Sequence, residues 1–182
     1  GQVMRVNFDY DSMVPMSVLG KKNGYQHLYL EAKGNAAAGT THFSWLDKGK
    51  FYTLTSSTSK ADELLFTRLG ANDPKFNLRR DAAFMIRRKA ARDTVFASIV
   101  EPHGSYDPVS ELAINSNTSI AALTVVHDGD DYTAVAIEDV EGRTSMFIVS
   151  NAESSASRQH ELDIANMLYR WTGPYYYVTK DH

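Results

Sequence analysis

Apolar and polar residues alternate along most of this 182-residue chain. Met4, Val6 and Phe8 alternate with polar neighbours near the start, and Leu28 and Leu30 do the same further along. A period of two places successive side chains on opposite faces of a β-strand. The other stretches with a strand-like pattern are 43–45, 51–55, 64–69, 83–88, 94–100, 120–126, 132–137, 144–149, 167–171 and 175–178. The pattern therefore predicts about a dozen short strands.

Short polar links that contain glycine separate several of these stretches. The links 47–50, 127–131 and 140–143 have the composition of hairpin turns. Many short strands at this spacing favour an all-β fold, an antiparallel β-sandwich with alternate apolar side chains between its layers. We expect little helix: residues 61–65 are compatible with one helical turn, and 154–164 with a short helix or a loop. The prediction is a single β-sandwich domain over residues 1–182.

The composition narrows the possible partners. Hydrophobic content of 43% and charged content of 23% are ordinary for a globular protein. A net charge of −3 gives no field that attracts nucleic acid. There are no cysteines, which excludes disulfides and thiolate metal sites. No apolar run approaches the roughly 20 residues of a membrane helix, so we expect no membrane span. Residue 1 is Gly and a strand-like pattern follows at once, so we expect a parent protein that extends upstream.

The segment 101–106, with the sequence EPHGSY, follows the apolar run 95–100. Pro102 interrupts a hydrogen-bonded ladder and Gly104 favours unusual backbone angles. The sequence therefore predicts that a strand ends here in a turn, where a scaffold commonly presents functional groups.

Three side chains of this segment can take part in proton transfer. His103 and Tyr106 both exchange protons, so one interpretation is an acid–base site at a sugar or ester. The other is a turn whose His and Tyr only bind backbone groups or cap strand ends. A complete small enzyme that uses Glu101, His103 and Tyr106 is the boldest form of the first interpretation.

Basic side chains gather between residues 75 and 92. Arginine binds carboxylates in bidentate geometry, so this stretch could hold an acidic sugar. Asp73, Asp81 and Asp93 lie close in sequence, so a solvated surface of mixed charge is the alternative. Arg79 and Arg80, together with His103 and Tyr106, are the candidates for contacts with a substrate or a neighbouring domain. The whole basic set is Lys75, Arg79, Arg80, Arg87, Arg88, Lys89 and Arg92.

Other site classes find little support. The acidic turn 128–131 is too short to supply calcium ligands, and the six histidines show no zinc-binding spacing. There is no Gly-x-Ser-x-Gly elbow, phosphate-binding loop or dinucleotide fingerprint. We therefore predict no metal or cofactor in this chain. In the segment 175–177, alternation places the side chains of Tyr175 and Tyr177 on the same face of a strand. These rings could form a platform that binds carbohydrate, or they could fill the core of the sandwich.

Five ordered blocks of the sequence carry a resemblance to a known family: 24–31, 51–55, 69–74, 76–79 and 99–104. They resemble the last part of family 17 polysaccharide lyases, the oligoalginate lyases of the heparinase II/III-like superfamily. The resemblance extends from about residue 2 to about residue 111 and more loosely to the C-terminus. It implies a two-part protein, with an N-terminal α/α toroid and a C-terminal antiparallel β-sheet domain. It also implies exolytic β-elimination of alginate oligosaccharides.

In the family, the catalytic groups lie mainly in the toroid, and a structural zinc site lies near a segment similar to His-Gly-His-x-Asp. This chain has no such segment, so the resemblance carries over no catalytic or zinc residue. It implies a C-terminal fragment with a scaffold or interface role, whose partners are the missing toroid and an acidic oligosaccharide. We expect this chain alone to be inactive and the parent to be periplasmic or secreted. The alternative is an autonomous carbohydrate-binding or structural β-sandwich.

Overall fold

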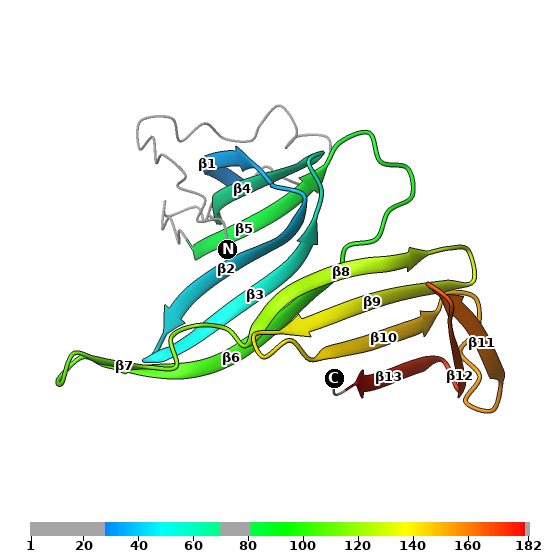
Figure 1. Cartoon of the computed structure of the whole chain (residues 1–182). Helices are drawn as coiled ribbons and strands as arrows, with labels where there is room; N and C mark the ends of the chain where they lie inside the picture. Colours follow the sequence, from blue (N-terminus) through cyan, green and yellow to red (C-terminus); the bar gives the residue numbers. More distant parts are fainter. Residues whose placement is uncertain (1–27, 70–80, 181–182) are drawn as a thin grey trace. The chain divides into compact units, whose positions relative to one another are not determined.

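The computed structural model describes residues 28–69 and 81–180, which form thirteen β-strands and no helix (Figure 1). Every strand pair is antiparallel, which confirms the predicted all-β class. Within the described ranges, no helix is long and apolar enough to cross a membrane. The strands are β1 Leu28–Asn35, β2 Gly39–Asp47, β3 Lys50–Thr58, β4 Asp62–Leu69, β5 Asp81–Arg88, β6 Ser98–Asp107, β7 Leu112–Ile114, β8 Ile120–Asp128, β9 Tyr132–Asp139, β10 Thr144–Ser150, β11 Gln159–Ile164, β12 Met167–Thr172 and β13 Tyr175–Lys180.

The chain divides into two compact units. Among the described residues, the first unit comprises 38–58 and 93–180, and the second comprises 28–37, 59–69 and 81–92. The second unit holds one three-stranded sheet with the order β1-β4-β5. That residues 1–182 form a single domain, the distal part of a larger lyase, stays a prediction.

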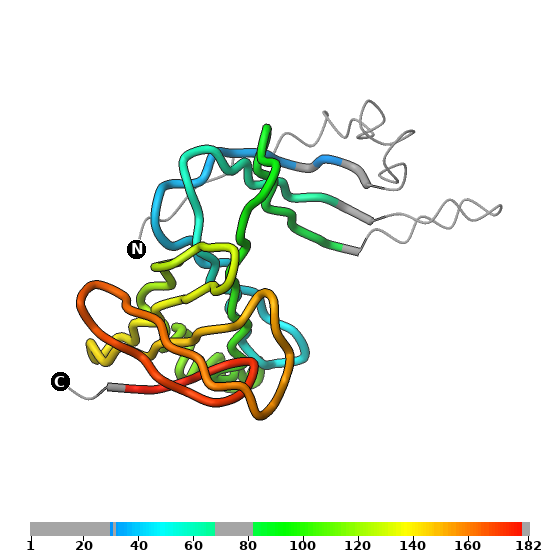
Figure 2. Tube along the Cα trace, turned by 90° about the vertical axis from the view of Figure 1, so that its right-hand side faces the viewer, coloured from blue at the N-terminus to red at the C-terminus, as the bar shows by residue number. Residues whose placement is uncertain are grey.

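The first unit contains two four-stranded sheets and a separate hairpin. Sheet I has the order β2-β3-β6-β7, sheet II has the order β13-β10-β9-β8, and β11 pairs with β12. One face of sheet II packs on the β11–β12 hairpin, which Figure 2 shows in orange beside the yellow strands of the sheet. Ala134 and Ile148 from the sheet meet Tyr169 and Trp171 from the hairpin in this core.

The three predicted hairpins are present. In the first, Lys48 and Gly49 both have positive φ, 49° and 76°, which is the geometry of a type I′ turn. The links 127–131 and 140–143 join β8 to β9 and β9 to β10. The predicted strand at 3–8 lies outside the described residues.

The two helical expectations are wrong. Residues 62–69 form the central strand β4, whose backbone pairs with β1 on one side and β5 on the other. Residues 159–164 form β11, in which His160 is buried and pairs with Trp171. In both places, cross-strand pairing outweighs a weak local preference for a helical turn.

Candidate functional site

The segment 101–106 lies inside β6 and not in a turn, so the predicted end of the strand is wrong. Pro102 pairs with Tyr52 of β3. In the described part of the chain, β6 pairs with β7 only from Ser105 to Asp107. Pro102 therefore has a neighbour on one side only, and a proline is tolerated where its missing N–H faces an unpaired side.

Gly104 forms a β-bulge in the pairing of β6 with β3. The register steps from Phe51↔His103 to Lys50↔Ser105, which leaves Gly104 as the extra residue, with φ of 50°. An added Cβ would lie 2.1 Å from the carbonyl oxygens of both Ile114 and Asn115, so the strand needs glycine here. The extra residue also shifts the alternation, so that Glu101, His103 and Tyr106 all lie on the more buried face of β6.

Both ring nitrogens of His103 are engaged within the protein. Nδ1 lies 2.8 Å from the carbonyl oxygen of Asn115, which can only accept, so Nδ1 carries a proton. Nε2 lies 2.8 Å from the hydroxyl of Thr53, which lies 2.7 Å from the hydroxyl of Ser44. With a neutral imidazole, Ser44 donates to Thr53 and Thr53 donates to His103. The ring also stacks on Phe51, so His103 ties β6, β3 and residue 115 together.

Glu101 is also committed to a structural contact. It accepts hydrogen bonds from the hydroxyl of Thr118 and from the backbone N–H and hydroxyl of Ser119, the last at 2.6 Å. Burial raises the pKa of Glu101, but the hydrogen bonds from Ser119 and Thr118 outweigh it and hold that pKa below its ordinary value. The carboxylate therefore stays ionised at neutral pH and fixes the link before β8. It is poorly suited to donate a proton.

Tyr106 is the least committed group of the three. Its backbone N–H donates to the carbonyl of Gly49 at 2.9 Å, and its ring is half-buried. Among the described residues, its hydroxyl has no hydrogen-bond partner. The structure thus gathers Glu101, His103 and Tyr106 on one face of a strand. Arg79 and Arg80 lie outside the described residues, so their predicted role stays a prediction.

Three cations of the basic stretch have carboxylate partners in the second unit. Arg87 and Lys89 both contact Glu63, each at 2.7 Å. Arg88 binds Asp62 through Nε at 2.7 Å and Nη2 at 2.8 Å. These cations have carboxylate partners, which favours the interpretation as a charge-mixed surface over a binding groove. No group of three metal-ligating side chains occurs among the residues described.

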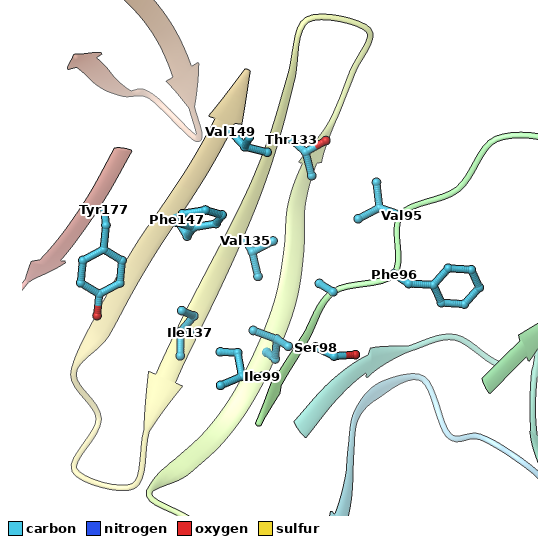
Figure 3. Close-up of a pocket in the computed structure, with 12 residues that line it drawn as sticks. Val95, Phe96, Ser98, Ile99, Thr133, Val135, Ile137, Phe147, Val149 and Tyr177 are labelled. Carbon is cyan, nitrogen blue, oxygen red and sulfur yellow. The ribbon is translucent and has the colours of Figure 1, made fainter. Parts of the chain in front are cut away.

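A groove of about 450 Å³ lies in the first unit, and sequence reasoning did not identify it. Figure 3 shows the lining side chains on β9, β10 and β13 on one side and on the segment 95–99 on the other. Its walls are apolar, and the lining includes Val135, Phe147 and Tyr177. The available signal was the continuous apolar runs in 134–137, 146–149 and 175–178, which are typical of strands covered on both faces.

Two curated proteins with a similar sequence are named as lyases. An alginate lyase from Stenotrophomonas maltophilia is 34% identical over 157 residues, which is 86% of this chain and 21% of the relative. An exo-oligoalginate lyase from Saccharophagus degradans is 28% identical over 177 residues, 95% of this chain and 24% of the relative. This chain is related to polysaccharide lyases. It spans between a fifth and a quarter of the length of these curated relatives. No family model matches it.

Proposed function

We propose that this chain is the C-terminal β-sandwich of an exolytic oligoalginate lyase of family 17, which cleaves uronate oligosaccharides by β-elimination. Its role is to support the catalytic toroid and to form an interface with it. One observation carries the proposal: lyases match nearly all of this chain, yet the match covers only 21% and 24% of their lengths. A periplasmic or secreted location belongs to the same proposal.

The chemistry of the candidate site supports a scaffold role. A β-elimination needs a group that neutralises the uronate carboxylate, a base for the neighbouring proton and an acid for the leaving oxygen. Both nitrogens of His103 are bound within the protein, and Glu101 is an ionised clamp. Of these three side chains, only Tyr106 keeps an uncommitted polar group. One phenol does not supply three roles, which supports the proposal that the catalytic groups lie in another part of the longer polypeptide.

The test is an activity assay of the pure 182-residue chain with oligoalginate. We expect no rise in the ultraviolet absorbance of unsaturated uronate, whereas the longer encoded protein produces it under the same conditions. Sustained product formation by the chain alone would reject the scaffold role. In that event, His103→Ala and Tyr106→Phe show whether these groups transfer protons, because such a role is worth about 10²–10⁴ in rate.

A second candidate is an autonomous carbohydrate-binding module. The observation in its favour is that Tyr175 and Tyr177 are exposed on the same face of sheet II, beside Phe147. Exposed aromatic rings can stack on sugar faces. Calorimetric titration with neutral and uronic oligosaccharides separates the two proposals: a module binds sugar by itself, whereas a scaffold domain gives no heat of binding.

A further inference from the structure

Sheet II is apolar on both faces, and the residues that the structure describes cover only one of them completely. On the covered face, Ala134 and Ile148 are fully buried against the β11–β12 hairpin. A sheet with one solvated face shows alternating apolar and polar residues, whereas a sheet covered on both faces shows continuous apolar runs. Strand β10 reads Met146, Phe147, Ile148 and Val149 without a polar break. The sequence of sheet II is therefore that of a sheet with cover on both sides.

The second face forms the floor of the groove. Two rows of cross-strand partners run over it, Val135–Phe147–Tyr177 and Thr133–Val149–Tyr175. At the β9 end of the rows the side chains are covered, and Val135 is only 9% exposed. Towards β13, the edge strand among the described residues, the side chains become exposed to solvent. The exposed fractions are 37% for Phe147, 57% for Tyr177 and 63% for Tyr175. The segment 95–99 therefore covers only about half of this face of the sheet (Figure 3).

We propose that the open half of this groove seats an apolar segment from another part of the same, longer polypeptide. The inference rests on the proposed function, because it needs a protein of which this chain is one part. The match covers only 21% and 24% of the related lyases, so a large partner region within one polypeptide is expected. Contiguous exposed aromatic and aliphatic side chains on a soluble domain mark an interaction surface.

The absence of charge in the groove lining favours an apolar segment over an acidic sugar as the bound group. None of the side chains that line the groove carries a charge. A uronate carboxylate placed there would lose its hydration without a cationic partner, which is strongly unfavourable. An apolar segment instead gains from burial of the exposed rings. Its backbone can also pair with β13, which within the described residues forms the edge of sheet II.

The experiment is hydroxyl-radical footprinting with mass spectrometry, on the 182-residue chain and on the intact longer polypeptide. In the intact polypeptide, we expect the oxidation rates of Tyr175 and Tyr177 to fall about six- to sevenfold. That is the fall expected if their exposure drops from 63% and 57% to the 9% of Val135. Leu168, which is 46% exposed on β12 and lies outside the groove, serves as the control and keeps its rate.

A variant of the intact polypeptide provides the second measurement. Phe147→Lys places a charge on the open floor without changing the core below the sheet. We expect it to displace the segment and return Tyr175 and Tyr177 to the oxidation rates of the isolated chain. Val140→Lys, at a 66% exposed position in the β9–β10 turn, is the matched control and leaves the protection intact.

Several results overturn the proposal. Equal oxidation rates in the two proteins mean that nothing of the longer polypeptide covers the groove, while its lyase activity still decides the proposed function separately. Protection that grows with protein concentration assigns the groove to a second copy of the chain. Protection that appears only with oligoalginate assigns it to sugar. If the encoded polypeptide ends at these 182 residues, the proposed function itself fails.

Discussion

At the scale of single residues, Gly104 determines where the groups of the candidate site lie. The sequence marked Pro102 and Gly104 as strand-breaking residues, and that expectation has a sound local basis. The same glycine chemistry also serves a bulge that lets a strand continue, and the outcome depends on the partner strands. Here the bulge brings Tyr106 to the same face as His103. Local sequence could identify the irregular position, but not its effect on the neighbouring side chains.

Gly104→Ala is predicted to destabilise the first unit strongly. Its φ of 50° disfavours an L-residue by about 1–2 kcal/mol. The new methyl group would also lie 2.1 Å from two backbone carbonyl oxygens, and overpacking of this kind costs about 1–3 kcal/mol more. Denaturant unfolding followed by tryptophan fluorescence measures the loss, because both tryptophans lie in this unit.

Gly142→Ala is the matched control for this prediction. Gly142 also has a positive φ, 85°, but nothing lies within 4 Å of the position that its Cβ would take. Only the backbone term of about 1–2 kcal/mol applies there. Equal losses for the two variants would show that the close approach of β6 to Ile114 and Asn115 contributes nothing to stability.

At the scale of the strands, the two-residue alternation predicted where the strands lie better than it predicted which face of each strand is buried. In sheet I, the alternate apolar residues were expected between the layers. Instead Thr53 and Thr55 are fully buried, while Trp45 and Val100 are 40% and 55% exposed on the other face. Alternation shows that two faces differ, but the face that is covered depends on what packs there. The expectation therefore fails for sheet I, where the buried hydroxyl of Thr53 forms hydrogen bonds with Ser44 and His103.

Sheet II allows a direct test of alternation with two adjacent tyrosines. Tyr176 contacts Trp171 and Tyr169 in the core, whereas Tyr175 is exposed on the opposite face. We expect Tyr176→Ala to lower the free energy of unfolding by about 3 kcal/mol, the lower end for removal of a large core ring. Tyr175→Ala should change it by less than about 0.5 kcal/mol. Urea unfolding of the 182-residue chain measures both, and similar losses would contradict the assigned faces.

At the scale of the whole molecule, the question is whether the two compact units unfold together. The sequence contains two tryptophans, Trp45 and Trp171, and both belong to the first unit. Tryptophan emission therefore reports the first unit, while circular dichroism reports the strands of both. A selective change in the second unit can separate the two signals. The single domain predicted from the sequence requires that they coincide, and two separate units require that they differ.

Asp62 is the place to make that change. Its buried carboxylate accepts hydrogen bonds from Arg88 and from the N–H of Ser59. The hydrogen bonds from Arg88 lower the pKa of Asp62, burial opposes them, and the net pKa lies below the ordinary 3.8. A carboxyl whose pKa is depressed on folding adds stability above its unfolded pKa, and this stability is lost as pH falls through the folded pKa. The pair therefore contributes fully at neutral pH.

Asp62→Asn is predicted to cost about 3–5 kcal/mol at pH 7, because it leaves the partly buried Arg88 without its ionised partner. We expect the dichroism midpoint in urea to fall while the midpoint of tryptophan emission stays in place. Glu161→Gln, which breaks the exposed pair with Arg170, is the control and shifts neither signal measurably. The difference between Asp62→Asn and the parent chain should shrink as pH falls below 3.8 and through the lowered folded pKa of Asp62, where protonation removes the same charge. If both midpoints fall together at pH 7, the units form one cooperative domain.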